Sequence, residues 1–461
     1  MPHALTQTNK AVRPNEKRND RNNWACLNIP KANRFALNPA QTSDTNCMRG
    51  PKYPNRRCNF ATMEMRTSAL LGRLSESATI AMARKAAELK SSGMDVISLS
   101  LGEPDFDTPD PLKAAGIAAI EDNVTHYTPV PGIQDVREAI AHKFQRDNGL
   151  PYTPDQIVVS NGAKQSITNV VLSLVDPGEE VLLPAPYWVS YADMVALAGG
   201  KAVVMPTRIE DDFKIQPEAL EAAIHKNTRL LIYSSPCNPS GSVYTKEETA
   251  AIAEVLRRHP QVFAISDEIY ELINFTEAHA SLAAEDGMWD RVITVNGVSK
   301  GFAMTGWRLG YIGAPTWIAK ACSKIQGQVT SAPCSIAQVA AGAAVASDPS
   351  IANEMKAAFL KRRDMMIDGL KAVPGMVVNQ PMGAFYLFPD ISSWFGKTTP
   401  TGQVLKDSSD VAMYLLEHAH VATVAGQAFG TPECIRLSYA ASDATLAKAI
   451  SRIQKAAESL T

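Results

Sequence analysis

A lysine follows a stretch of the chain that predicts a buried strand. Residues 292–313 read VITVNGVSKGFAMTGWRLGYIG, so the apolar run 292–295 leads to Ser299 and Lys300, and then to Arg308. Burial at the end of a strand disfavours the charged form of an ammonium group and lowers its pKa. A lysine in that position can act as a nucleophile, whereas most lysines are solvated loop residues. The motifs elsewhere in the chain decide between these two interpretations.

Residues suited to binding a cofactor follow four other predicted strands in the same way. These strands and the segments after them are 157–160 with NGAKQS (Ala163, Lys164), 181–183 with PAPYWVSY (Trp188), 230–233 with SSPCNPSG (Asn238), and 262–265 with SDEIY (Asp267, Tyr270). The first of these segments is a small-residue turn that opens a helix, whose free N–H groups suit a phosphate. In open α/β sheets, ligands bind beside the carboxyl ends of the strands. We therefore expect these residues to meet at one edge of a sheet.

Pyridoxal phosphate is a cofactor that needs this combination of groups. Lys300 would form the Schiff base with its aldehyde, and Asp267 would keep its ring nitrogen protonated. Asn238 and Tyr270 would hydrogen-bond its phenolic oxygen, and Trp188 would stack on its ring. The phosphate would be held by groups near the turn, namely Ser299, Arg308 and the backbone amides of Ala163 and Lys164.

Each of these residues also has an ordinary structural use. Asp267 could cap a helix, Trp188 could fill the core, and Asn238 could be a plain turn residue. Arg308 could form a surface ion pair that contributes little. The cofactor interpretation is preferred because all of these residues occur together, each after a predicted strand.

The composition is that of a globular protein large enough for two domains. The chain has 461 residues, of which 45% are apolar and 20% charged, and no run approaches the roughly 18 apolar residues of a membrane span. The seven cysteines form no CxxC pair, so we expect neither a disulfide framework nor a metal site. No GxGxxG follows a predicted strand, which argues against a nicotinamide-dependent oxidoreductase.

The first 62 residues differ in charge from the rest of the chain. They hold eleven Lys and Arg against three Asp and Glu, a balance of +8, so the remainder carries −10 of the total of −2. An acidic body is not expected to bind nucleic acid. The basic segment has no apolar core of a secretory signal, and we expect an organelle transit peptide, most simply a plastid one. The alternative is a cytoplasmic form that starts at Met63 or Met65.

Short apolar runs alternate with longer amphipathic stretches from about residue 150, the pattern of a mostly parallel sheet covered by helices. The predicted strands are 157–160, 181–183, 202–205, 230–233, 262–265, 292–295 and 310–312, with helices at 165–174, 217–225 and 246–258. Beyond residue 349 come long helices (351–373, 411–419) and separated strands (384–388, 434–438). We predict an α/β fold with a large seven-stranded domain at 110–349, and a smaller α+β domain formed by 63–109 and 350–461.

The motifs SNGAKQS, PCNPSG, SDEIY and VSKGFAMTGWRLGY resemble those of the class I aminotransferases of the fold-type I pyridoxal-phosphate group. The resemblance runs from about Ser68 to the C-terminus. It implies a homodimer with active sites at the subunit interface, in which Tyr127 of HYTPVPG reaches the neighbouring subunit's phosphate site. It also implies that Arg436 of CIRLSYA clamps the substrate's α-carboxylate, and that the backbone of Gly102 lines the same pocket, which Trp188 and Asn238 share.

Two further positions bear on the substrate. Lys164 and Thr79 resemble residues of the bacterial and plastid type of aspartate aminotransferase that also accepts prephenate, and they would meet the distal carboxylate and orient the larger acid. Lys164 could equally be a solvated lysine at a helix start, and Thr79 a helix cap. A plain aspartate aminotransferase and a carbon–sulfur lyase on the same fold remain open. A non-catalytic regulator is disfavoured because Lys300 is present.

Overall fold

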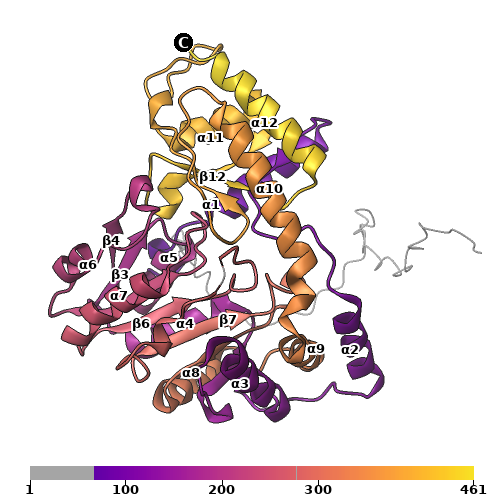
Figure 1. Ribbon diagram of the computed structural model, residues 1–461, viewed down its shortest axis with the longest axis vertical. Helices are drawn as coiled ribbons and strands as arrows, with labels where there is room; N and C mark the ends of the chain where they lie inside the picture. The colour runs from indigo at the N-terminus through magenta and orange to yellow at the C-terminus, as the bar shows by residue number, and fades with distance from the viewer. Residues whose placement is uncertain (1–66, 277) are drawn as a thin grey trace, which may run out of the picture. The chain divides into compact units, whose positions relative to one another are not determined.

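A seven-stranded sheet forms the larger layer of the protein. The computed structural model describes residues 67–276 and 278–461 (Figure 1), so the predicted leader and both alternative start sites lie outside the described residues. The strand order is β2-β8-β7-β6-β5-β3-β4. Only β8 runs antiparallel to its neighbours. The strands are β2 (Ile157–Ser160), β3 (Glu180–Ala185), β4 (Lys201–Pro206), β5 (Thr228–Ser234), β6 (Phe263–Asp267), β7 (Val292–Gly297) and β8 (Gly310–Gly313).

This sheet confirms the predicted α/β fold with a mostly parallel seven-stranded sheet. Each of the seven predicted strands is present, and six of them differ from the prediction at one end or both. For β5, β6 and β7 the reason is that the prediction stopped at the last apolar residue, whereas the backbone pairing continues into polar residues. Asp267, for example, still pairs with Ser234 and Val295 on the two neighbouring strands. The pairing therefore fixes the backbone of Asp267 within the sheet itself.

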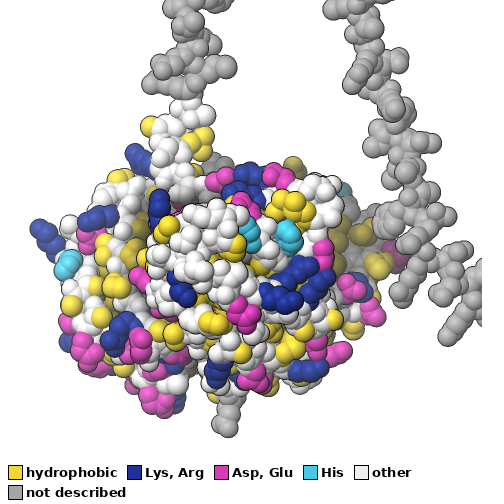
Figure 2. Space-filling view, turned by 90° about the horizontal axis from the view of Figure 1, so that it is seen from above, with side chains coloured by type: hydrophobic (Ala, Val, Ile, Leu, Met, Phe, Trp, Pro, Cys, Tyr) yellow, Lys and Arg dark blue, Asp and Glu magenta, His cyan; other side chains and the backbone are white. Residues whose placement is uncertain are grey.

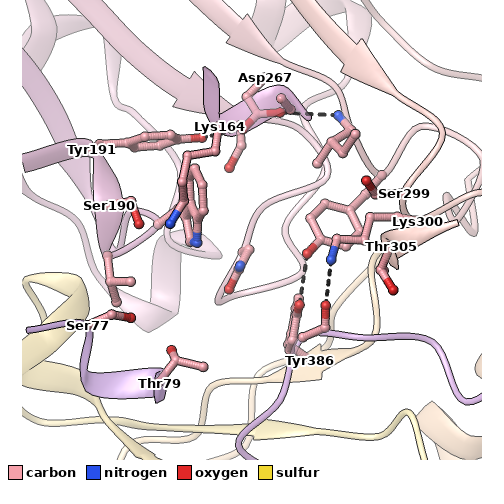
Figure 3. Close-up of a pocket in the computed structure, with 18 of the residues that line it drawn as sticks. Ser77, Thr79, Lys164, Ser190, Tyr191, Asp267, Ser299, Lys300, Thr305 and Tyr386 are labelled. Carbon is pink, nitrogen blue, oxygen red and sulfur yellow. Dashed lines mark hydrogen bonds between the residues drawn. The ribbon is translucent and has the colours of Figure 1, made fainter. Parts of the chain in front are cut away.

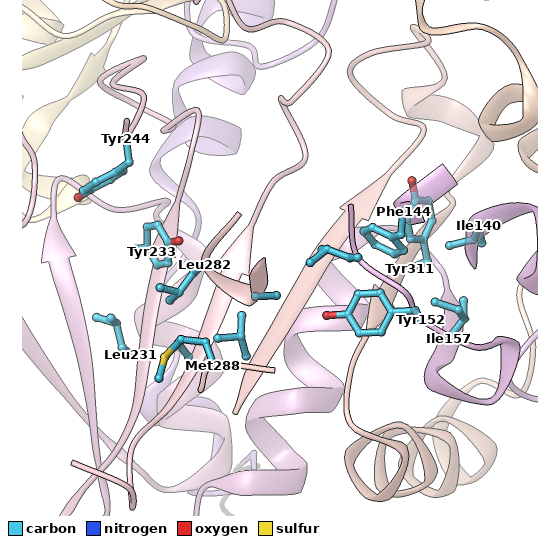
Figure 4. Close-up of a cluster of buried hydrophobic side chains, with 14 of the residues drawn as sticks. Ile140, Phe144, Tyr152, Ile157, Leu231, Tyr233, Tyr244, Leu282, Met288 and Tyr311 are labelled. Atoms are coloured by element: carbon cyan, nitrogen blue, oxygen red, sulfur yellow. The ribbon is translucent and has the colours of Figure 1, made fainter. Parts of the chain in front are cut away.

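Alternate residues of each central strand enter different hydrophobic clusters on the two faces of the sheet. On β5, Leu230 and Ile232 pack in one cluster, and Leu231 and Tyr233 in the other (Figure 4). The first cluster contains residues of α4 (Ala163–Leu174), α5 (Ser190–Ala198) and α8 (Thr316–Val329). The second contains residues of α2 (Asp110–Glu121), α3 (Gln134–Asn148), α6 (Pro217–Ala223), α7 (Lys246–Arg258) and α9 (Ser335–Ala346). Helices thus cover both faces and leave the strand ends to form a site.

A smaller layer joins the beginning of the described chain to its end. Strand β1 (Ile97–Ser98) pairs in parallel with β10 (Val421–Ala422). A second small sheet has the order β11-β12-β9, with β11 (Val424–Ala425), β12 (Ile435–Ser438) and β9 (Tyr386–Leu387). The helices of this layer are α1 (Ala78–Ser91), α10 (Asn353–Lys371), α11 (Ser408–His418) and α12 (Asp443–Glu458).

Short 3₁₀ turns link many of these elements. The predicted helix 351–373 begins in the structure as a 3₁₀ turn over Pro349–Ala352, and the α-helix α10 follows it over Asn353–Lys371. No helix of the described residues is long and apolar enough to cross a membrane. The 3₁₀ turns are Leu71–Arg73, Pro154–Gln156, Ile209–Asp211, Leu282–Ala284, Thr305–Trp307, Pro349–Ala352, Ser392–Trp394 and Gly426–Phe429.

Charged side chains of both signs are interspersed on the face seen in Figure 2. Some exposed side chains of the smaller layer form ion pairs with one another. Asp95, just before β1, accepts from Lys448 and Arg452 of α12 at 2.5 and 2.7 Å. These exposed pairs contribute little individually, but they join the N-terminal segment of the layer to its last helix.

Candidate active site

A cavity of about 260 Å³ lies at the carboxyl ends of the central strands. Figure 3 shows side chains from the sheet, from the start of α1 and from the smaller layer pointing into it. Every predicted site residue except Tyr127 lines this cavity: Thr79, Gly102, Ala163, Lys164, Trp188, Asn238, Asp267, Tyr270, Ser299, Lys300, Arg308 and Arg436.

Lys300 follows β7 and is partly buried in this cavity. Its Nζ donates a hydrogen bond to the carbonyl oxygen of Gly102 at 2.5 Å. Burial lowers the pKa of Lys300 to about 8, with Glu103 opposing the shift and Arg436 and Arg308 adding to it. A substantial fraction of the amine is therefore neutral close to physiological pH, as a nucleophile or proton acceptor requires.

Asp267 is the last residue of β6, and its side chain is buried. Its Oδ2 accepts a hydrogen bond from the Tyr191 hydroxyl at 2.7 Å, and its Oδ1 accepts one from the backbone N–H of Ile269 at 3.3 Å. Burial raises the pKa of Asp267 to about 6. No lysine, arginine or histidine of the described residues forms an ion pair with this carboxylate. A buried carboxylate of this kind fits a protonated ring nitrogen, so the site agrees with the cofactor predicted from the sequence.

The ring-binding side chains lie between these two residues and the smaller layer. Trp188 is half-buried, and its ring packs edge-on against Tyr191 at 5.5 Å between centroids. The hydroxyl of Tyr270 shares a hydrogen bond of 2.8 Å with that of Tyr386, which comes from β9. Burial raises the pKa of both tyrosines. Both hydroxyls therefore stay protonated, and the one that accepts in their shared hydrogen bond keeps its own proton to donate to an oxygen of a ligand.

The residues predicted to hold a phosphate meet where the start of α4 approaches Arg308. The helix begins at Ala163 after Gly162, and no side chain caps its first turn in this part of the structure. Gly162 has φ of +82°, and a Cβ there would lie 2.6 Å from Nη2 of Arg308. A Cβ at Gly310 would lie 2.2 Å from the backbone nitrogen of Ala163. Both glycines are thus required for the arginine and the free amides to face the same point, and buried Ser299 lines the same cavity.

Arg436 presents a buried guanidinium from β12. It donates to the Ser100 carbonyl at 2.6 Å and to Oδ1 of Asn238 at 2.9 Å, and it lies 4.7 Å from the centre of the Tyr386 ring. Burial lowers the pKa of Arg436, which nevertheless stays charged. It forms no ion pair with a carboxylate of the described chain. A carboxylate of a ligand would supply the missing countercharge.

Lys164 and Thr79 line the cavity from different elements. Lys164 lies in the first turn of α4, with Nζ 4.9 Å from the centre of the Trp188 ring. Burial lowers its pKa, and the charge of Arg308 lowers it further. Thr79 lies in the first turn of α1, and Figure 3 shows it beside Ser77 on the side of the cavity away from Asp267.

Sequence reasoning missed several residues of this cavity. Tyr191 lies three residues after Trp188 at the start of α5, a spacing that places the two side chains on one side of the chain. Tyr386 comes from the smaller layer, and no signal in the sequence links it to Tyr270. The cavity also includes Ser77, Ser190 and Thr305.

Tyr127 is the one predicted residue that the structure does not bring to this cavity. Its side chain is fully exposed, in the segment between α2 and α3. The prediction concerned the site of a second copy of the chain, so it stays a prediction.

Comparison with known proteins gives the family that the sequence motifs resemble, over nearly the whole described chain. Residues 94–453 match the family model described as aminotransferase class I and II. A protein of Petunia hybrida named bifunctional aspartate aminotransferase and glutamate/aspartate-prephenate aminotransferase is 50% identical over 385 residues, 82% of this chain and 80% of its own. An aspartate/prephenate aminotransferase of Cereibacter sphaeroides is 47% identical over 84% of this chain and 97% of its own. The solved aspartate aminotransferase of Thermus thermophilus with maleate has a TM-score of 0.79 at 40% identity, and covers 85% of this chain and 100% of its own.

We expect Lys300 to react with pyridoxal phosphate at a lower pH than an exposed lysine, whose pKa is about 10.4. The rate at which the cofactor-free chain takes up pyridoxal phosphate, followed by absorbance, should rise with pH through a midpoint near pH 8, where half of the amine is neutral, and level off above it. Borohydride reduction should fix the cofactor to the peptide that contains Lys300. The Lys300→Ala protein should lose both this covalent link and turnover, and a covalent link retained in that variant would contradict the assignment.

Proposed function

We propose that this chain, which belongs to the class I and class II aminotransferases, moves amino groups between aspartate or glutamate and 2-oxo acids, prephenate among them. It is a fold-type I enzyme that depends on pyridoxal 5′-phosphate. The observation that carries the substrate proposal is the pair of cationic side chains, Arg436 and Lys164, in one cavity. Aspartate, glutamate and prephenate each carry two carboxylates, which such a pair can bind.

The proposed roles follow from the positions of the side chains. When bound, pyridoxal phosphate supplies an electron-accepting ring that makes the substrate's α-proton acidic. Asp267 would hold the ring nitrogen protonated, and Trp188 would cover one face of the ring. Asn238 and Tyr270 would donate to the phenolic oxygen, since the amide of Asn238 already uses its oxygen to accept from Arg436. The phosphate would be held by Ser299, Arg308 and the amides of Ala163 and Lys164.

Lys300 would carry out the proton transfers of the reaction. Once the substrate amine has displaced Lys300 from the cofactor, the free amine of Lys300 would take the proton from the substrate's α-carbon. It would then deliver that proton to C4′ of the cofactor. A base needs a pKa near the working pH, and it must lie within hydrogen-bond reach of the atom it serves. Its lowered pKa and its hydrogen bond to Gly102, beside the substrate clamp, support this role.

Prephenate is proposed as a substrate because the relatives that match over most of this chain carry it in their names. The solved Thermus relative contains maleate, a dicarboxylate, which supports binding of two carboxylates by a site of this family. Thr79 would orient the larger acid from the start of α1. A plain aspartate aminotransferase is the alternative. A carbon–sulfur lyase on the same fold is a second alternative, and it is less favoured because the relatives that match over most of this chain are named as aminotransferases.

The substrate proposal predicts separate effects for the two cationic residues. Loss of one partner from a buried charge pair costs about 2 to 5 kcal/mol, so Arg436→Ala should lower kcat/KM for every substrate. Lys164→Ala should lower kcat/KM for dicarboxylic substrates more than for alanine or phenylalanine. Thr79→Val, which keeps the shape and removes the hydroxyl, should weaken prephenate more than oxaloacetate. The measurement is kcat/KM for prephenate with glutamate and with aspartate as donor, for oxaloacetate with glutamate as donor, and for alanine and phenylalanine as donors with 2-oxoglutarate as acceptor.

The wild-type enzyme provides the decisive comparison in the same assay. Turnover of oxaloacetate without any turnover of prephenate would leave a plain aspartate aminotransferase. Release of pyruvate from cystathionine in the absence of an amino acceptor would instead identify a lyase. Thr305→Ser, a conservative change at the rim of the cavity, is a control that should leave the ratio of the two acceptors unchanged.

The working enzyme is proposed to be a homodimer that completes each site across the interface. The support is Tyr127, whose side chain is fully exposed and lies outside its own chain's cavity, in the segment between α2 and α3. In a symmetric dimer each copy can donate the same residue to the other.

This proposal predicts complementation between two inactive proteins. Tyr127→Ala should weaken cofactor binding, and Lys300→Ala should abolish turnover. If the two variants are unfolded and refolded together, about one quarter of all sites should combine an intact lysine with an intact tyrosine from the other copy. Activity recovered in the mixture, and absent from each variant alone, would support the shared site. A mixture no more active than its parts would contradict it.

Residues 1–62 are proposed to direct the enzyme to a plastid, with a cytoplasmic form from Met63 or Met65 as the alternative. The support is the basic charge of this segment, +8 against −10 for the remainder. A fluorescent protein fused behind residues 1–62 should enter chloroplasts in plant cells. Uniform cytoplasmic fluorescence would favour the alternative.

A further inference from the structure

A second group of ionisable side chains lies beneath the end of β6, outside the cavity. It consists of Glu268, Glu271, His279 and Lys143, the last of these on α3. Glu268 is completely buried, Lys143 is 3% exposed, and the His279 side chain is 9% exposed. Glu268 directly follows Asp267 in the chain. The reaction as described above uses none of these four residues, although burying them is costly.

The contacts divide this group into two ion pairs. Lys143 contacts Glu271, and both side chains are bound by Asn148, at 2.8 and 2.9 Å. Lys143 is therefore already paired with Glu271 and forms no ion pair with Glu268. His279 places Nε2 2.9 Å from Oε2 of Glu268, and it is the one basic residue of the described chain that pairs with this carboxylate.

Glu268 is otherwise fixed by neutral groups. Its Oε1 accepts hydrogen bonds from Ser266 at 2.9 Å and from Ser281 at 2.7 Å. Hydroxyl groups stabilise a carboxylate without cancelling its charge. The charge of Glu268 is balanced within the protein only when His279 is an imidazolium.

The surroundings of His279 favour that charged form. The ionisable groups that face it are Glu268, Glu271 and Lys143. Burial disfavours the imidazolium and Lys143 opposes it, but the two carboxylates outweigh both, so the pKa of His279 is raised. The ion pair is therefore retained as pH rises past the ordinary range for histidine, and it is lost only above the raised pKa.

The charge of Glu268 acts on Asp267. After burial, the neighbouring Glu268 carboxylate further raises the pKa of Asp267. Without compensation, Glu268 would favour a protonated Asp267, which cannot hold a proton on the ring nitrogen. We propose that His279 is a positioning residue: as an imidazolium against Glu268, it cancels the charge beneath Asp267 and keeps Asp267 ionised toward the cofactor's ring nitrogen. This inference rests on the role proposed above for Asp267.

The test is the protonation of the ring nitrogen in the holoenzyme, reconstituted with ¹⁵N-labelled pyridoxal phosphate and followed by its ¹⁵N chemical shift at pH 7.5. We expect the protonated value in the wild type and a movement toward the unprotonated value in His279→Gln. The affinity for the cofactor should fall about tenfold in that variant, equivalent to about one unit of pKa. His142→Gln, an exposed histidine on α3, is the matched control and should behave as the wild type.

A double variant separates charge from packing. Glu268→Gln keeps an oxygen that can accept from both serines, so Glu268→Gln/His279→Gln should restore the protonated ¹⁵N value. If the ¹⁵N chemical shift of the double variant stays near the unprotonated value, His279 acts by packing alone and the proposal fails. An unchanged ¹⁵N chemical shift in His279→Gln would also overturn the proposal. If His279→Gln does not fold, the pH dependence tests the proposal instead. As pH rises and His279 loses its proton, the ¹⁵N value should move toward the unprotonated value at a lower pH in the wild type than in Glu268→Gln. Identical pH profiles would overturn the proposal.

Asp267→Asn distinguishes this inference from its premise. If that variant leaves the ring nitrogen protonated, the proposed role of Asp267 fails. If Asp267→Asn loses the proton and His279→Gln does not, only the role of His279 fails. No substrate is present in either measurement, so the outcome is independent of whether prephenate is turned over.

Discussion

The site depends on Asp267 and Lys300 remaining apart, although Asp267 ends β6 and Lys300 follows the neighbouring parallel strand β7 by three residues. Adjacent strands are about 4.8 Å apart, and a direct ion pair would neutralise both groups for catalysis. The structure prevents this by giving each residue a different partner. Asp267 is bound by Tyr191 and by the backbone of Ile269, whereas Lys300 reaches across to the Gly102 carbonyl of the N-terminal segment. Burial then shifts the pKa values of the two residues toward one another, to about 6 and about 8.

Neutral partners are a general feature of the charges around this cavity. Arg436 donates to a carbonyl and to an amide oxygen, and Asp267 accepts from a tyrosine hydroxyl and from a backbone N–H. Hydrogen bonds of this kind offset part of the cost of burying a charge, but they leave the charge itself available. The cavity can therefore attract an anionic substrate without first breaking an ion pair. The ion pair between His279 and Glu268 is the exception. It lies outside the cavity, where no ligand can compensate the charge of Glu268.

The fold and much of the site could be predicted because parallel strands bring their carboxyl ends to one edge. The residues directly after each predicted strand, such as Asn238, Asp267 and Lys300, needed only the strands to be placed correctly. Partners from other elements could not be predicted in this way. Tyr386 is 116 residues from Tyr270, and its contact depends on how the smaller layer packs. His279 follows a loop, and its sequence surroundings give no sign that it is buried against Glu268. The predicted role of Tyr127 depends on a second copy, which no single chain can display.

The pairing of β1 with β10 sets the order in which the parts of the site can be completed during synthesis. A nascent chain that has reached residue 349 already contains all seven strands of the large sheet, with Asp267 and Lys300. Strand β1 has no partner until residues 421–422 leave the ribosome, and Arg436 follows later still. The segment that carries Thr79 and Gly102 must therefore wait for nearly the whole chain. A chain that ends before residue 421 would still contain Asp267, Lys300 and Lys164, but it would lack Arg436 and would leave β1 without its partner strand.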